Sequence, residues 1–130
     1  MVLSTYYELL KDYISFKTLH DTSTFVSEAE KMVKWLANLF VKYHFEVHEY
    51  SVDDIPLLVA KFVQNKNLPT CLIYTNYDLQ LQEVTTDWKN NPFNLYLGKE
   101  EIIGRGVAEN KGPFIIYLST ILSLIANEKL

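Results

Sequence analysis

The chain has 130 residues, 48% hydrophobic and 14% aromatic, which is enough for one domain with a buried core. We therefore expect residues 1–130 to form a single domain. The net charge of −4 and the pI near 5.3 argue against a nucleic-acid partner, because no cluster of basic residues is available to neutralise phosphates.

The cysteine content and the apolar stretches indicate in which cellular compartment the protein is expected. Cys71 is the single cysteine and cannot form an internal disulfide, and it lies in an apolar run that predicts a buried thiol. The first fifteen residues have no basic leader followed by an apolar run. The longest apolar stretch, 113–126, is too short to span a membrane. We expect a cytoplasmic protein without a membrane partner.

Two amphipathic helices are predicted in the first third of the chain. Thr5 and Glu8 have the spacing of a capping box, and apolar residues then recur at helical spacing as far as Ile14. Ser27 and Glu30 repeat the capping-box spacing before a second helix. The apolar stripe of that second helix consists of Ala29, Met32, Val33, Leu36, Ala37, Phe40 and Tyr43.

The middle of the chain has the patterns of strands. After residue 43 the hydrophobic period changes from helical to alternating, which predicts a strand over 45–50. A second strand is predicted over 55–63. The short apolar run 71–74 predicts a third strand, one that is buried on both of its faces.

The last third of the chain predicts a hairpin and a helix. Residues 94–97 and 101–103 flank a short turn that contains Gly98, and residues 114–126 form an apolar helix. A long polar connection over 79–93 precedes the hairpin. The order of helices, strands and a final helix predicts an α/β fold in which helices pack on a mixed sheet.

Two motifs contain the residues that could bind a ligand or take part in catalysis. Asn-Tyr-Asp at 76–78 directly follows the predicted third strand, and alternate residues leaving a strand point the same way. About thirty residues later, Gly-Arg-Gly at 104–106 leads into Glu-Asn-Lys-Gly at 109–112. The two glycines lack the third glycine of a dinucleotide fingerprint and the Gly-Lys-Ser/Thr of a phosphate-binding loop, so neither nucleotide motif is present.

These motifs, with Trp88 and Asn-Pro-Phe at 91–93, resemble the zinc aminoacylase/carboxypeptidase/dipeptidase family. This family includes carnosinase, glutamate carboxypeptidase and acetylornithine deacetylase, and the Trp and Pro-Phe pieces resemble its dipeptidase branch. The resemblance covers nearly the whole chain. It implies a partial zinc-peptidase-like catalytic domain, equivalent to the N-terminal part of the family's domain, with the lid or dimerisation domain absent.

The resemblance also assigns roles to individual residues. The family has His-x-Asp where this chain has Asn76 and Asp78; its histidine binds one metal, and its aspartate orients the imidazole. Asp78 keeps the orienting position, whereas Asn76 offers an amide at the position of the metal ligand. Glu109 replaces an aspartate that bridges two metals, and Asn110 replaces a neighbouring acid. Because homologues hold the peptide bond after that aspartate in cis, a cis Glu109-Asn110 bond is predicted.

Zinc is the cofactor that the resemblance implies, but this chain retains only Glu109 as an ordinary ligand, and a catalytic zinc needs about three. The first hypothesis is part of a metal-dependent peptidase or deacylase, inactive alone, which acts on a peptide-like substrate when completed. The alternative is a non-catalytic interaction or regulatory module that kept the fold. A third option is a domain that binds a small polar ligand in the former cleft.

Partners follow from the same comparison. Family members complete their sheet with strands from later sequence, so we expect this chain to leave a strand edge or a helix face uncovered. Such surfaces recruit other polypeptides. The expected partner is either a second copy of the chain, giving a homo-oligomer, or a complementing chain.

Overall fold

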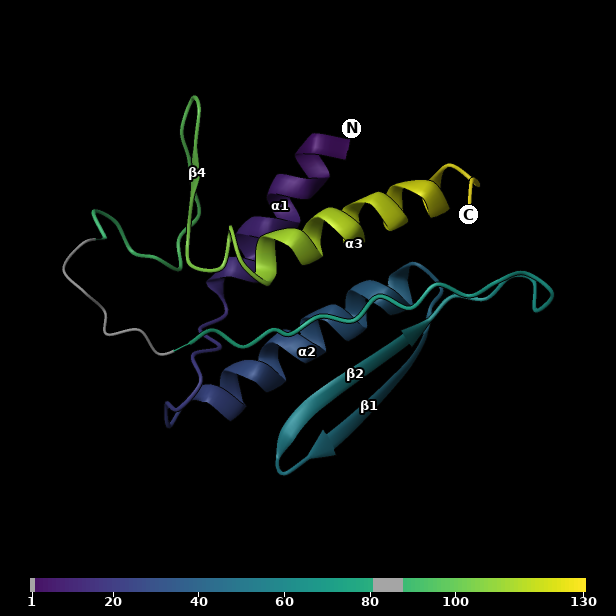
Figure 1. Ribbon diagram of the computed structural model, residues 1–130, viewed down its shortest axis with the longest axis horizontal. Coiled ribbons are helices and arrows are strands. Elements are labelled where there is room, and N and C mark those ends of the chain that lie inside the picture. The colour runs from purple at the N-terminus through teal and green to yellow at the C-terminus, as the bar shows by residue number, and fades with distance from the viewer. Residues whose placement is uncertain (1, 81–87) are drawn as a thin grey trace.

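The computed structural model describes residues 2–80 and 88–130. Helices α1 and α3 lie side by side, and α2 packs against the hairpin of β1 and β2 (Figure 1). The α/β class predicted from the sequence is confirmed. No helix in the described ranges is long and apolar enough to cross a membrane. The elements are α1 (Val2–Ser15), α2 (Phe25–Lys42), β1 (Glu46–Val52), β2 (Ile55–Lys61), β3 (Tyr96–Leu97), β4 (Ile102–Ile103) and α3 (Lys111–Ala126).

The hydrophobic core lies where the three helices meet. Its buried members come from α1, α2 and α3 in similar numbers, and burying one such side chain stabilises the fold by roughly 1.5–3 kcal/mol. The predicted stripe of α2 is confirmed, with its last two aromatic residues only partly buried. The core residues are Leu9, Leu10, Tyr13, Ile14, Met32, Val33, Leu36, Ile115, Leu118 and Leu122.

Neither predicted capping box marks the start of a helix. α1 begins at Val2 and already includes Thr5, and α2 begins at Phe25, so Ser27 lies in its first turn. The Ser27 hydroxyl donates to the main-chain oxygen of Thr24 at 3.0 Å instead of accepting from a free N–H. Phe25, the first residue of α2, is buried, and the N-cap residue Thr24 makes no side-chain capping bond.

Within residues 2–80 and 88–130 the strands form two small antiparallel ladders, where a mixed sheet was expected. β1 pairs with β2 in a register that runs from Glu46 opposite Lys61 to Val52 opposite Ile55. β3 pairs with β4 over two residues each, which confirms the predicted hairpin around Gly98. Each ladder joins two strands that follow one another in the sequence. Such antiparallel pairs need only a short connecting turn and no strand from a distant part of the chain.

The predicted third strand is not a strand in this structure. Residues 71–74 are extended, but no described residue pairs with them, and Leu72 and Tyr74 are 88% and 81% exposed. Cys71 is exposed as well, which corrects the expectation of a buried thiol. Burial on both faces needs strands on both edges and layers above and below. In Figure 1 this segment instead passes as a single teal line in front of α2.

α3 begins in a tight turn, three residues before its predicted start. A Cβ on Gly112 would lie 1.8 Å from the main-chain oxygen of Val107, and the amide of Gly112 donates to the oxygen of Gly106 at 2.9 Å. Gly106 itself has a φ of 88°, in the left-handed region that favours glycine. The two glycines therefore let the chain turn directly into the helix.

Lys111, the first residue of α3, is completely buried and caps the end of α1. Its Nζ donates to the main-chain oxygens of Tyr13 at 3.2 Å and of Phe16 at 2.5 Å, which are among the carbonyls left unpaired at a helix end. Burial lowers the pKa of Lys111 to about 7 from its ordinary value of 10.5, against the smaller opposing effect of Glu28.

The buried amine predicts a stability that rises with pH. In the unfolded chain Lys111 keeps its proton up to about pH 10.5, whereas the folded chain releases it at about pH 7. The cost of burying the charge is therefore fully present below pH 7 and is relieved between these two values, at up to about 1.4 kcal/mol per pH unit. Urea denaturation across this window measures the slope.

Two variants separate Lys111 from other titrating groups. Lys111→Met removes the titrating amine. The free energy of unfolding of this variant should therefore lack the part of the increase with pH that Lys111 causes in the wild type. Lys34→Met changes an exposed lysine of α2 and should keep the full rise. Equal slopes for the wild type and Lys111→Met would contradict the assignment.

The turn before α3 makes a second prediction. Gly112→Ala should destabilise the fold by about 1–3 kcal/mol or more, because the new methyl group meets main-chain atoms that cannot move aside cheaply. Gly98→Ala is the matched control, since its Cβ would come no closer than 3.1 Å to any neighbour. Thermal unfolding measures both, and a smaller loss at Gly112 than at Gly98 would disagree with this geometry.

Candidate functional site

One pocket brings the two sequence motifs together. Its volume is about 380 Å³, and it is lined by the end of the extended segment and by the turn before α3. Asn76, Asp78 and Glu109, the three residues singled out from the sequence, all line it. Trp88 and Arg105 contribute further walls. Their proximity makes a shared site feasible, while the roles assigned to them remain predictions.

The loop after α1 holds the first motif in place. Leu79 is buried; its amide donates to the oxygen of Thr18, and its oxygen accepts from the amide of His20, both at 2.8 Å. The Thr18 hydroxyl donates to the oxygen of Tyr77 at 2.6 Å, and the Tyr77 hydroxyl donates to the oxygen of Pro56 at 2.7 Å. With Tyr77 fixed in this way, the residues on either side of it line the pocket.

The second motif is tied directly to the first. The Asn110 side-chain amide donates to the main-chain oxygen of Asp78 at 2.9 Å, and Arg105 Nη2 donates to the oxygen of Gln80 at 2.6 Å. The described residues contain no cis peptide bond, so the predicted cis Glu109-Asn110 bond is wrong. The chain turns there through a positive φ of 60° at Asn110, which asparagine tolerates better than most residues.

The donor set of the pocket does not by itself fit a catalytic zinc. It offers the carboxylates of Asp78 and Glu109 and the amide of Asn76, whose Oδ1 already accepts from the Tyr74 hydroxyl at 2.8 Å. Within residues 2–80 and 88–130, no group of three histidine, cysteine or acidic residues could hold a metal. Zinc sites use imidazole, thiolate or carboxylate ligands, and a catalytic one takes about three from the protein.

None of the three histidines of the sequence, all of them in the described ranges, lines the pocket. His20 and Asp21 form an exposed pair at 2.9 Å, and this hydrogen bond raises the pKa of His20, with the charges of Asp21 and then Asp78 adding in the same direction. His48 pairs with Glu46 at 2.7 Å on β1. Each contact is a local pairing on the surface.

Sequence reasoning missed two features of the site. Asn110 was identified only as a lost acid, whereas its side chain joins the two motifs across 32 positions of sequence. Lys111 was identified only as part of a motif, whereas it anchors the turn to α1. The bonding partners of Lys111 are main-chain oxygens, which leave no pattern in the sequence. The one available signal for its role was a lysine at the start of an otherwise apolar helix.

No family model matches the chain, but individual proteins of known function are similar to it. The Cys-Gly metallodipeptidase dug1 of Schizosaccharomyces pombe is 29% identical over 97 residues, which are 74% of this chain and 20% of that protein. The Cys-Gly metallodipeptidase DUG1 of Candida albicans is 34% identical over 68 residues, which are 51% of this chain and 14% of that protein.

The fold has a solved counterpart as well. Human carnosine dipeptidase 1 superimposes with a TM-score of 0.87 at 18% identity, over 98% of this chain and 29% of that one. The chain thus spans less than a third of the length of each protein compared here. In sequence the chain is thus similar to metallodipeptidases, and in fold it is similar to a dipeptidase of known structure.

Proposed function

We propose that this chain is a metallodipeptidase-type domain that carries one part of a peptide-hydrolysing metal site. It is inactive alone and contributes to hydrolysis when further ligands and a general base come from additional polypeptide. The observation that carries the proposal is the single pocket in which Asn76, Asp78 and Glu109 meet, built from the two motifs and tied by the Asn110 bond. The substrate class is a dipeptide, from the names of the relatives.

Within this proposal, Glu109 is the metal ligand, Asn76 stands at the position of a second ligand, and Asp78 is the carboxylate that orients it. Zinc is the proposed metal. Asp78 and Glu109 line the pocket together with Asn76, and the proposed cation would lie between them. The exposed single thiol of Cys71 supports a reducing, cytoplasmic location.

A non-catalytic interaction module is the second candidate. The observation in its favour is the exposed, unpaired apolar segment at 71–74, which is a surface that another polypeptide could cover. The two candidates differ in the pocket: the first requires that cation binding there can be improved by restoring ligands, and the second does not.

Zinc titration by calorimetry tests the pocket. The wild type should bind Zn²⁺ weakly, since two carboxylates and one amide form an incomplete set. Asn76→His combined with Glu109→Asp should tighten binding by at least tenfold, because an imidazole then replaces the amide and a shorter carboxylate replaces the longer one. The matched control is Asn94→His with Glu101→Asp, which makes the same exchanges at exposed positions of the hairpin and should change nothing. No gain in the pocket variant would count against this proposal and for the interaction module.

Hydrolysis assays test the need for completion. The purified chain with added Zn²⁺ should not release glycine from Cys-Gly. Co-expression with the part of Schizosaccharomyces pombe dug1 outside the matched region should restore activity if that part can supply the missing groups. Activity should then fall at least tenfold in the Glu109→Gln variant, whose amide cannot act as an anionic ligand. Release of glycine by the chain alone would contradict the proposal.

A further inference from the structure

Asn110, whose side chain ties the two motifs of the pocket together, has an unusual main-chain conformation. Its φ of 60° and ψ of −73° lie close to those of the γ-turn with a positive φ. The amide of Lys111 closes this turn by donating to the main-chain oxygen of Glu109 at 2.7 Å. Such turns are rare and strained, and strain of this kind persists only where the surrounding structure enforces it.

Contacts on both sides of Asn110 enforce the turn. After it, the buried Lys111 amine donates to two main-chain oxygens near the end of α1, and Gly112 packs against the main chain of Val107 with no room for a Cβ. Before α3, the Asn110 side-chain amide donates to the main-chain oxygen of Asp78 at 2.9 Å. The turn is therefore held from two directions and has little freedom to relax.

The side chain of Asn110 also does not perform the usual task of asparagine at its position. Asn110 is the N-cap of α3, where the side-chain oxygen of an asparagine ordinarily accepts from an amide of the first helical turn. Among the described residues Asn110 makes no such capping bond, and its amide donates to Asp78 in the other motif. Both its main chain and its side chain thus depart from what the helix alone would favour, and Asn110 itself lines the pocket.

The bond between Asn110 and Asp78 links the two acids of the pocket closely. Its donor belongs to the residue that directly follows Glu109, and its acceptor is the main-chain oxygen of Asp78 itself. The bond from Arg105 to Gln80 also joins the two motifs, but its donor lies further from Glu109 along the chain. Loss of the Asn110 bond should therefore change the distance between the two acids more directly than it changes the fold.

We propose that Asn110 is the positioning residue of the pocket. Its side-chain bond and its strained turn together hold Glu109 and Asp78 at a fixed spacing, so that both carboxylates can meet one ligand without prior rearrangement. What the two acids do there rests on the function proposed above, whereas their spacing can be measured without metal or substrate.

An ordinary helix cap would respond differently to substitution. Aspartate is as good an N-cap residue as asparagine, and its charge suits the start of a helix, so Asn110→Asp would change nothing if Asn110 only capped α3. A carboxylate has no N–H to donate, however, and it would repel the main-chain oxygen of Asp78. If Asn110 positions the acids, Asn110→Asp releases them from their fixed spacing although the size of the side chain is preserved.

Thiol cross-linking measures the spacing. Asp78→Cys with Glu109→Cys, in a chain that also carries Cys71→Ser, should be bridged by one molecule of a short bifunctional thiol reagent, which intact-mass spectrometry detects. Adding Asn110→Asp or Asn110→Gly should slow the bridging by about tenfold, because the effective concentration of the second thiol falls when the spacing is no longer fixed. Glycine adopts a positive φ without strain, so slowing in Asn110→Gly would come from the missing side-chain bond.

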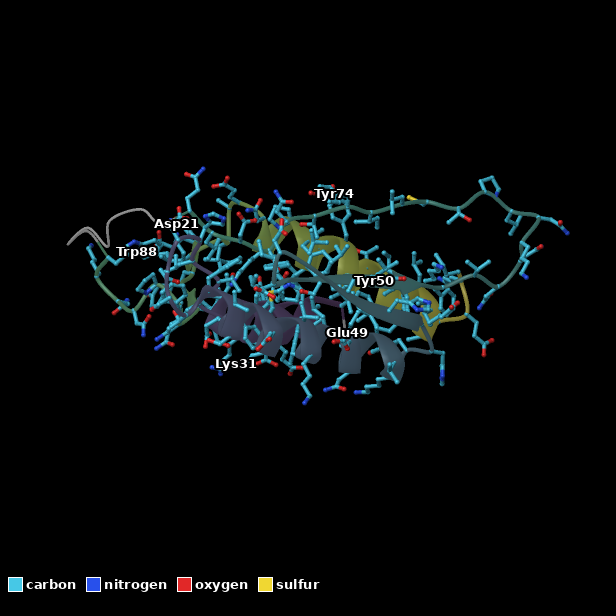
Figure 2. All side chains as sticks on the ribbon, turned by 90° about the horizontal axis from the view of Figure 1, so that it is seen from below. Asp21, Lys31, Glu49, Tyr50, Tyr74 and Trp88 are labelled. Atoms are coloured by element: carbon cyan, nitrogen blue, oxygen red, sulfur yellow. The ribbon has the colours of Figure 1, made fainter. Side chains whose placement is uncertain are left out.

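A cysteine pair across the β1–β2 hairpin is the matched control. Tyr50 and Leu57 are register partners there, and Figure 2 shows Tyr50 well apart from Trp88, which lines the pocket. Tyr50→Cys with Leu57→Cys, again with Cys71→Ser, should be bridged at the same rate with and without the Asn110 substitutions. Circular dichroism verifies that each variant is folded.

Unchanged bridging of the pocket pair in both Asn110 variants would overturn the proposal. Slowing in Asn110→Gly alone would overturn it as well, since the loss of the donor is common to both variants. Equal slowing of the hairpin pair would do the same, because it would show a general loosening of the fold. These results are independent of the metal site: slowed bridging with no gain in the zinc titration removes only the proposed function, and the reverse pair of results removes only the positioning role.

Discussion

The buried Lys111 amine is the interaction on which the arrangement of this molecule depends. It joins the first residue of α3 to the last carbonyls of α1, and these two helices form one side of the core. A neutral or charged amine in this position can satisfy oxygens that the helix leaves unpaired. Because Lys111 also closes the turn that presents Glu109 and Asn110, the packing of the core and the shape of the pocket are set together.

The pocket is held by a second set of long-range contacts. Thr18 and Leu79 fix the end of the extended segment, and Asn110 binds it from the other side. The likeness to the dipeptidases is one of fold as well as of sequence. The pocket differs from a complete metal centre in its donors, since one of its three central residues is an amide.

Local patterns in the sequence predicted the elements whose stabilising contacts lie within a short stretch of the chain. The stripe of α2, the β1–β2 hairpin and the turn around Gly98 all follow from period and turn residues within a short window. The motif residues Asn76, Asp78 and Glu109 were placed in one site through resemblance to a family, and the structure brings them to one pocket. Their roles await the zinc titration.

The failures share a physical cause. The apolar run at 71–74 was predicted as a buried strand, but burial depends on neighbouring strands that a local pattern cannot report. The capping boxes had the right spacing, yet α2 begins at Phe25, two residues before Ser27, without a side-chain capping bond. The cis bond was inferred from relatives, whereas this chain turns through the positive φ of Asn110. In each case the outcome depends on how the whole chain packs, which neither a short window of sequence nor a resemblance reports.

The bond from Asn110 to Asp78 has a consequence for how such a protein can change over evolutionary time. This bond ends on a main-chain oxygen, as do the bonds of Lys111 and Thr18. None of these three bonds uses the carboxylates that face the pocket. Substitution at those acids should therefore cost the fold little. The atoms that hold the fold and the atoms that face the pocket are thus separate, and the pocket side chains can change while the fold persists.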